Sequence, residues 1–266
     1  MAIPKVRHLI EAGVHFGHRA SRWHPAMAKY IFGKNKLIHI IDLKSTVRGL
    51  VTARKLLTAA SASGEQVLFV GTKRQARPIV RRYAQACEMP YVAERWLGGL
   101  LTNFRTIRSR MRRLEELETM EEDGTFEELS KKRVSVLRRE MHKLQKNFEG
   151  IRHMKKLPSV VMVIDPRKEH NAVLEARKLD IPVIALLDTD CNPNRIDIPI
   201  PGNDDALRSI DVVMRSLTDA VIAGRAERMG GGEQLQQVKQ PEPVAPPEPS
   251  ALQEAAEQAA GPEQVS

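Results

Sequence analysis

Ser159-Val160-Val161-Met162-Val163-Ile164 is an unbroken apolar run, and a second run, Pro182-Val183-Ile184-Ala185-Leu186-Leu187, follows it after a helical pattern at 169–178. Neither run alternates between apolar and polar residues, which is typical of strands that are buried on both faces. Two such strands joined by a helix form a βαβ unit, in which the crossover makes the strands parallel. This stretch therefore predicts an α/β protein with a mainly parallel sheet.

The same alternation of apolar runs and helical patterns occurs on both sides of this stretch. Asp42 or Ser45 is a suitable N-cap for one of the helices, and Gly64 suits its end, where a left-handed residue is needed. Strands that alternate with helices indicate a sheet covered by helices on both faces. The further strands are expected at 36–41, 67–70 and 91–93. The further helices are expected between the cap at Asp42 or Ser45 and Gly64, from 73 to about 86, and at about 204–223.

The pattern changes between residues 104 and 156, where apolar residues step by three and four on either side of Asp123-Gly124-Thr125. Two heptad-like arms around one turn predict an inserted antiparallel coiled-coil helical hairpin. The insertion divides the sheet domain into residues 1–103 and 157–226. Arginines gather at the start of the first arm and glutamates at its end, which predicts a basic root and an acidic tip. The alternative is an ordinary solvated helix surface with ion pairs along it.

The net charge of +9 is the sum of two oppositely charged parts. Residues 227–266 hold seven glutamates and two basic residues, a net charge of −5, together with six prolines. This segment cannot bury enough apolar surface to fold, which predicts a disordered acidic tail. The first 226 residues therefore carry +14. Such an excess attracts polyanions, and nucleic acid is favoured as the partner.

The remaining composition excludes several classes of protein. Cys87 and Cys191 are too few for a disulfide framework and do not form a CxxC pair. No apolar run approaches the roughly 18 residues that span a bilayer, and the first residues contain no stretch of signal-peptide length. These features predict a cytoplasmic protein with reduced thiols and no membrane partner.

An α/β sheet often carries a nucleotide site, but the residues that such a site needs are missing. The turn after the first strand has no glycine, and the turn after the second has only Gly71 where GxGxxG or GxxxxGK[ST] would be required. A phosphate could still lie at Gly71, and an RNA backbone is then its favoured source. An acid–base site is the alternative, although Asp204 also suits the N-cap of the last helix. Its candidate residues are Asp165, Glu169, His170, Asp188, Asp190, Asp204 and Asp205. We expect no catalytic residue, no cofactor and no small-molecule substrate.

Histidines 15, 18 and 24 raise the alternative of a metal site near the N-terminus. His15 and His18 would need further ligands from elsewhere in the fold, such as Asp188 or Asp190. Histidine spacing alone is weak evidence, and no cysteine joins these residues, so we expect no metal.

Basic residues are interleaved with aromatic ones in segment 13–36, a mixture that is typical of loops holding RNA by stacking and phosphate contacts. More basic residues fill the helix at 73–86 and the segment 95–113. Trp96, in the second of these, is expected to pack between the hairpin and the sheet, and Thr102 or Asn103 to cap the first arm. The expected RNA-binding residues are His15, His18, Arg19, Arg22, Lys29, Lys34, Lys36, Lys73, Arg74, Arg77, Arg81, Arg95, Asn103, Arg105, Arg108 and Arg112.

Several motifs resemble the family of the bacterial small-subunit (30S) ribosomal protein two, in the family's order and over about residues 1–226. They include Ala12-Gly13-Val14-His15-Phe16-Gly17-His18, Tyr30-Ile31-Phe32-Gly33, Phe69-Val70-Gly71-Thr72-Lys73-Arg74, Arg95-Trp96-Leu97-Gly98-Gly99-Leu100-Leu101-Thr102-Asn103 and Ile200-Pro201-Gly202-Asn203-Asp204-Asp205-Ala206. The resemblance implies a flavodoxin-like sheet with a coiled-coil hairpin, and a structural role in the cytoplasmic ribosome. It also implies contacts with small-subunit rRNA and neighbouring ribosomal proteins. Two further implications are late entry into the assembling subunit and docking of the large OB-fold protein that captures mRNA. By this similarity, residues 73–82 and 95–113 are expected to face rRNA.

Overall fold

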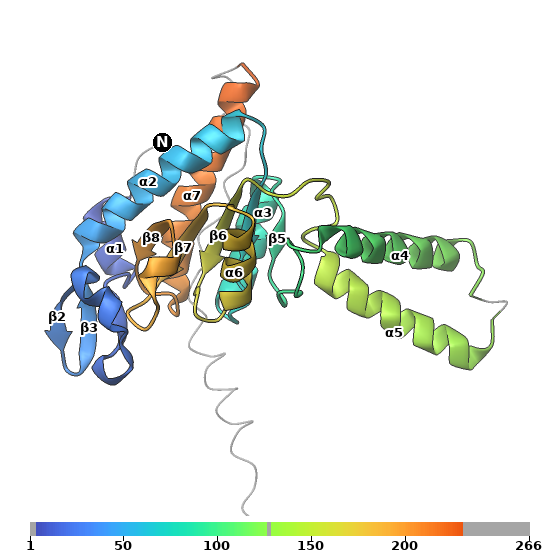
Figure 1. Cartoon of the computed structure of the whole chain (residues 1–266), viewed down its shortest axis with the longest axis horizontal. Coiled ribbons are helices and arrows are strands. Elements are labelled where there is room, and N and C mark those ends of the chain that lie inside the picture. Colours follow the sequence, from blue (N-terminus) through green and yellow to red (C-terminus); the bar gives the residue numbers. More distant parts are fainter. Residues whose placement is uncertain (1–3, 127–128, 231–266) are drawn as a thin grey trace, which may run out of the picture.

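A computed structural model describes residues 4–126 and 129–230, so that most of the predicted acidic tail lies outside the described residues. Within those ranges a parallel sheet of five strands forms the centre of the molecule (Figure 1). Its strands lie in the order β5-β4-β6-β7-β8, which is 2-1-3-4-5 along the chain, the flavodoxin-like order. The predicted α/β class and parallel sheet are confirmed. The strands are β4 (Val67–Val70), β5 (Tyr91–Val92), β6 (Val160–Ile164), β7 (Val183–Leu187) and β8 (Ile198–Pro201).

Helices cover both faces of this sheet, as the strand pattern predicts. α2 (Leu43–Ala62), α3 (Ala76–Ala86) and α7 (Leu207–Arg228) bury apolar side chains against one face, and α6 (His170–Lys178) covers the other. Alternate strand residues divide between the two cores, with Phe69 on the first face and Leu68 on the second. The strands are therefore buried on both sides, which is why they read as unbroken apolar runs.

The strand expected at 36–41 does not belong to the parallel sheet. Residues Ile38–Ile41 form β3, the central strand of an antiparallel three-stranded sheet with β1 (Phe16–Arg19) and β2 (Ile31–Asn35). The remaining place in the parallel sheet is taken by β8, which the sequence did not predict. Pro199 and Pro201 argue against a strand, because proline cannot donate to a sheet ladder, but β8 is an edge strand where proline is tolerated.

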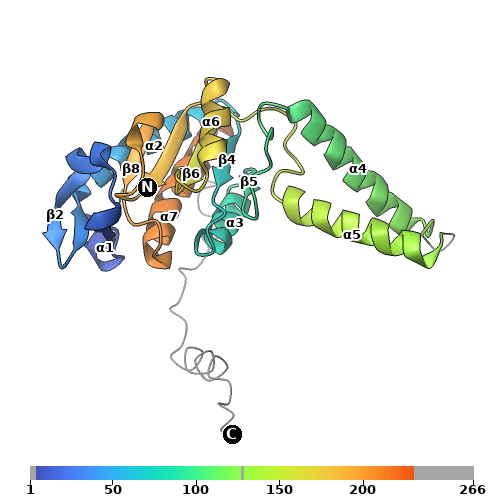
Figure 2. The same ribbon diagram turned by 60° about the horizontal axis from the view of Figure 1, so that its bottom comes forward.

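The segment after β5 forms two long helices, α4 (Phe104–Glu122) and α5 (Lys131–Phe148), that lie side by side and project away from the sheet (Figure 2). Their contact is built from the predicted apolar positions, among them Ile107, Met111 and Leu114 of α4 and Met141 of α5, all buried. Trp96 is buried in the same cluster, near the root of the pair. A supercoil and the expected domain boundaries stay predictions.

The structure confirms some of the expected helix ends and corrects others. The Asp42 carboxylate accepts hydrogen bonds from the backbone N–H groups of Lys44 and Ser45, and Gly64 follows α2 with φ +78°. The last helix begins at Leu207 and continues to Arg228, which is longer than expected. The prediction that Asp204 caps it is wrong, because Asn203 accepts the N–H groups of Asp205 and Ala206 while Asp204 is buried elsewhere.

The other elements are short and lie mostly in the N-terminal region. These elements are α1 (Val6–Glu11) and the 3-10 turns η1 (Ala20–Arg22), η2 (Pro25–Tyr30) and η3 (Pro193–Arg195).

No helix in the described ranges has the length and apolar character needed to cross a membrane.

Candidate functional site

The carboxyl end of the parallel sheet, where flavodoxin-like folds place their ligands, contains a buried cluster of charged side chains. The crevice lies between β4 and β6, since the following strands are added on opposite sides of this pair. Lys73, just after β4, extends its Nζ into the crevice and lies 3.1 Å from Asp165 Oδ2, 2.6 Å from Asp204 Oδ1 and 2.7 Å from Asp205 Oδ1. Side chains of the protein itself thus occupy the crevice in which flavodoxin-like folds bind their ligands.

The backbone position that was expected to bind a phosphate is also occupied by a side chain of the protein itself. Thr72 donates its backbone N–H to Glu169 Oε1 at 3.1 Å, and its hydroxyl donates to the same oxygen. A Cβ on Gly71 would lie 2.9 Å from Val80 Cγ2, so that the glycine allows close strand–helix packing. Glu169 and the glycine therefore serve the fold at the place where a nucleotide enzyme would bind phosphate.

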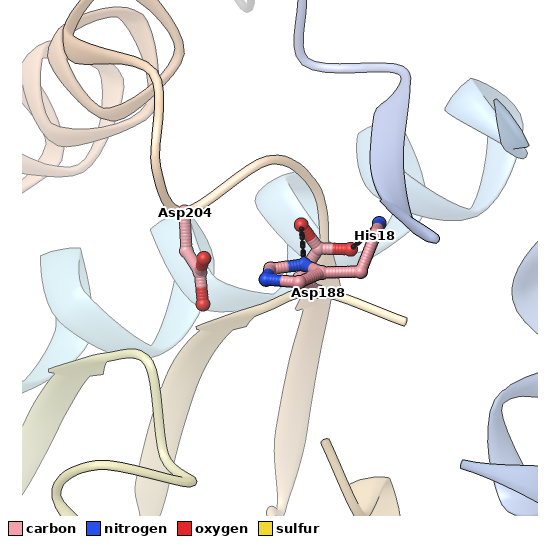
Figure 3. A group of neighbouring side chains, drawn as sticks. All are labelled: His18, Asp188 and Asp204. Carbon is pink, nitrogen blue, oxygen red and sulfur yellow. Dashed lines mark hydrogen bonds and ion pairs between the residues drawn. The ribbon is translucent and has the colours of Figure 1, made fainter. Parts of the chain in front are cut away.

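His18 joins this cluster from the antiparallel sheet (Figure 3). Its Nδ1 lies 2.8 Å from Asp188 Oδ2, at the end of β7, and its Nε2 lies 3.4 Å from Asp205 Oδ2. The close contact with Asp188 raises the pKa of His18 to about 9, against the opposing effect of partial burial. A Cβ on Gly17 would lie 2.7 Å from Thr189 Cγ2, so glycine is required for this approach. The charged imidazole fastens β1 to the parallel sheet.

Asp204 is the most enclosed acid of the cluster. Burial, together with the charge of Asp165, raises its pKa to about 8, although the adjacent Lys73 opposes the shift. Its Oδ2 is buried and accepts no hydrogen bond within the described part of the chain. Donor atoms of His18, Asp188 and Asp204 lie within 4.8 Å of one another and could hold a cation (Figure 3).

The metal ligands considered in the sequence are only partly brought together. His18 and Asp188 meet, and Asp190 Oδ2 lies 4.0 Å from His18 Nε2 while it also pairs with Arg167. His15 instead stacks against Phe16, with ring centroids 4.0 Å apart. Asp204, which was not among the ligands considered for this site, joins His18 and Asp188. A second set, Asp165, Cys191 and Asp204, also lies within 4.8 Å.

Two titratable groups of the cluster, Lys73 and Cys191, are poorly suited to acid–base or nucleophilic chemistry. Burial opposes the charge of Lys73, but the contacts with Asp204, Asp205 and Asp165 outweigh it and raise the pKa of its ammonium group above the usual range. Burial, followed by the charge of Asp190, raises the pKa of the Cys191 thiol. A lysine that keeps its proton and a thiol that stays neutral are weak bases and weak nucleophiles.

The structure divides the predicted RNA-binding cations into two groups. We call His18, Lys73, Arg77 and Arg81 the inner cations, because each is half-buried and paired with a carboxylate. Arg77 pairs with Glu94 at 3.1 Å and Arg81 with Glu149 at 2.8 Å. The other group is exposed and forms no ion pair with any described residue. We call these the outer cations: Arg19, Arg22, Lys29, Lys34, Lys36, Arg74, Arg95, Arg105, Arg108 and Arg112.

Three outer cations form a continuous stripe on the root of α4. Arg105, Arg108 and Arg112 are spaced by three and four residues, so they share one face of the helix. The opposite face carries buried Ile107 and Met111. Packing of α4 against α5 therefore presents the arginine stripe to solvent.

Glu175, which the sequence did not predict as a site residue, holds the loop that carries Arg95 and Asn103. Its carboxylate accepts hydrogen bonds from Trp96 Nε1 at 3.0 Å and from the backbone N–H groups of Gly99, Leu101 and Thr102 at 2.8–3.2 Å. Burial opposes ionisation, but these donors outweigh it and lower the pKa of Glu175. Asn103 itself is exposed at the N-terminus of α4, and no side-chain cap is formed there.

The model of the ribosomal protein S2 family matches residues 9–224 of this chain. The chain belongs to that family. The small ribosomal subunit protein uS2 of Rhodopirellula baltica is 55% identical over 227 residues, which cover 85% of this chain and 87% of the relative. The protein of the same name from Treponema pallidum (strain Nichols) is 52% identical over 222 residues, or 84% of this chain and 76% of the relative.

Membership of the S2 family confirms the prediction of a small-subunit ribosomal protein that takes part in translation in the cytoplasm. Ribosomal proteins of this kind are structural constituents of their particle rather than enzymes.

Proposed function

We propose that this S2-family chain is a non-catalytic constituent of the small subunit that binds small-subunit rRNA through its outer cations. The observation that carries the proposal is that these ten side chains are exposed and form no ion pair within the described ranges. Phosphates are the natural partners of such groups, and each contact releases counterions. We assign the main contact to the outer cations because carboxylates of the chain already pair with the inner cations.

The arginine stripe of α4 is the strongest single element of this surface. Arg105, Arg108 and Arg112 are exposed residues of α4, and this helix projects away from the parallel sheet (Figure 1). Arg95 and Asn103 lie at the base of the same helix, on the loop held by Glu175. We assign the stripe and this loop to one RNA contact.

Protein neighbours complete the proposed role. By the family resemblance we propose that the chain contacts adjacent small-subunit proteins, enters the subunit late in assembly, and helps to dock the OB-fold protein that captures mRNA.

A charge-reversal experiment tests the RNA contact. The triple variant Arg105→Glu, Arg108→Glu, Arg112→Glu should compete poorly with the wild-type chain for incorporation into small subunits. If three phosphate contacts are lost, the slope of log affinity against log salt should fall by about 2–3 units. Isotope-labelled chains mixed at equal concentration, followed by mass spectrometry of purified subunits, measure the competition.

The matched control reverses the same number of charges at the other end of the hairpin. Lys131→Glu, Lys132→Glu and Arg133→Glu change three exposed residues at the start of α5. This variant should be incorporated nearly as well as the wild type. Equal losses in both variants would indicate a general charge effect, and no loss in either would overturn the proposed contact.

A further inference from the structure

A groove with a volume of about 560 Å³ lies at the amino end of the parallel sheet, away from the charged cluster at the carboxyl end. It is lined by residues of two segments, 63–66 between α2 and β4 and 153–159 before β6, and we call it the amino-end groove. Lys155 and Lys156 are exposed there and form no ion pair with any described residue. Glu65 is the one acid among the described residues of the lining. The groove therefore has an excess of positive charge that the described part of the chain does not neutralise.

The last described residues of the chain lie beside this groove. α2 and α7 pack against each other, and their C-terminal ends lie side by side (Figure 1). A Cβ on Gly64 would lie 2.5 Å from Nη1 of Arg228, which brings the last residue of α7 to a residue that lines the groove. Gly230 is exposed two positions further on. The segment that follows Gly230 therefore starts next to the groove.

Residues 231–266 carry the opposite charge. They contain six glutamates and one lysine, a net charge of −5. The first glutamate, Glu233, lies three positions after Gly230, and three residues span at most about 10 Å. Leu235 follows, and it could pack on Leu157, which lines the groove and is 42% exposed. A segment tethered so closely has an effective concentration of about 1 mM at a neighbouring site, so even a weak contact is populated.

We propose that the acidic segment 231–266 binds the amino-end groove of its own chain before the chain enters a particle, with carboxylates at Lys155 and Lys156 and Leu235 on Leu157. Exposed ion pairs are individually weak, and the tether is what makes this occupant the favoured one. RNA or a second copy of the chain would have to bind the same groove without that advantage. The inference goes beyond the proposed function and does not depend on it, because it concerns the free chain.

Acylation of lysine amines in the full chain tests the contact. Changing the six glutamates of residues 231–266 to glutamine should raise the acylation rates of Lys155 and Lys156 about twofold, because a dissociation constant near the effective concentration protects about half of the molecules. Lys131 and Lys132, exposed at the start of α5, are the matched control and should react at unchanged rates. Equal circular dichroism spectra show that both chains are folded. Unchanged rates at all four lysines, or equal increases at all four, would overturn the proposal.

A photoreactive phenylalanine analogue at position 235 identifies what the segment contacts. Mass spectrometry should find a crosslink to residues 153–159 within the same chain, and the double variant Lys155→Gln, Lys156→Gln should weaken it. Crosslinks that form only between chains, or only outside the groove, contradict the proposal. Protection of the two lysines that appears only when small-subunit rRNA is added would make the groove an RNA contact and would equally overturn it. The proposed function is tested separately, since the arginine-stripe variant is assayed by incorporation and not in the free chain.

Discussion

Inner and outer cations are the same kinds of residue, often only one position apart, yet their environments are opposite. Lys73 lies among three carboxylates, whereas Arg74, the next residue, is exposed and forms no ion pair with any described residue. The sequence places both in one basic cluster. A basic cluster in a sequence can therefore contain two kinds of cation, one that holds elements of the fold together and one that stays available to a partner. Only the positions of the carboxylates separate them.

The largest effect on stability is expected when Lys73, the inner cation that contacts three carboxylates, loses its charge. Lys73→Met should lower the free energy of unfolding by about 3–5 kcal/mol, because it leaves buried Asp165 and Asp204 without their cation. Arg74→Met, one residue further, should change it by no more than about 0.5 kcal/mol. Urea unfolding of the two variants at neutral pH measures both values. Equal effects would show that the environments of the two residues do not differ as the structure indicates.

Local pattern was sufficient to predict much of this fold, and what it missed depends on contacts between distant residues. The runs at β6 and β7, the cap at Asp42 and the two long helices follow from burial and short-range hydrogen bonds. β3 reads as a strand equally well in either sheet, because an apolar run does not say which strand it will pair with. β8 was missed because edge strands tolerate proline, and the edge position is a property of the whole sheet.

The same limit applies to the candidate site. Lys73 is separated from Asp204 by 131 positions, and Glu175 from the loop that it holds by 73–79. No spacing rule links such residues, so spacing alone neither separates Lys73 from Arg74 nor gives Glu175 its role. The exposed stripe of Arg105, Arg108 and Arg112 could be predicted, since it depends only on helical periodicity within α4.

The second prediction concerns the charge of His18. Its raised pKa means that the folded chain holds the proton more tightly, so the stabilisation is fully present below the unfolded value of 6.5 and is lost as the pH rises through about 9. A shift of this size corresponds to about 3 kcal/mol. The stability of the wild-type chain should therefore fall relative to His18→Gln across that range.

Urea unfolding between pH 6 and pH 9.5 measures this difference. The variant His8→Gln, which removes an exposed histidine of α1, should remain parallel to the wild type throughout. NMR titration of the His18 ring provides the direct value. Parallel curves for wild type and His18→Gln would show that Asp188 does not hold a charged imidazole, and β1 would then need another attachment to the sheet.

The last and smallest effect links the inner charges to the outer ones. Glu175 is a partly buried anion whose hydrogen bonds shape the loop before α4, so Glu175→Gln should destabilise the fold by about 2 kcal/mol. Since its pKa is lowered, the stabilisation should be lost as the pH falls through the lowered value. Glu116→Gln, which changes an exposed glutamate of α4, is the matched control and should cost no more than about 0.5 kcal/mol. Incorporation into subunits should also fall for Glu175→Gln alone, because Arg95 and Asn103 then lose their fixed positions. If stability falls without any change in incorporation, the loop is part of the scaffold only, and the outer surface at this end of the molecule is confined to the arginine stripe.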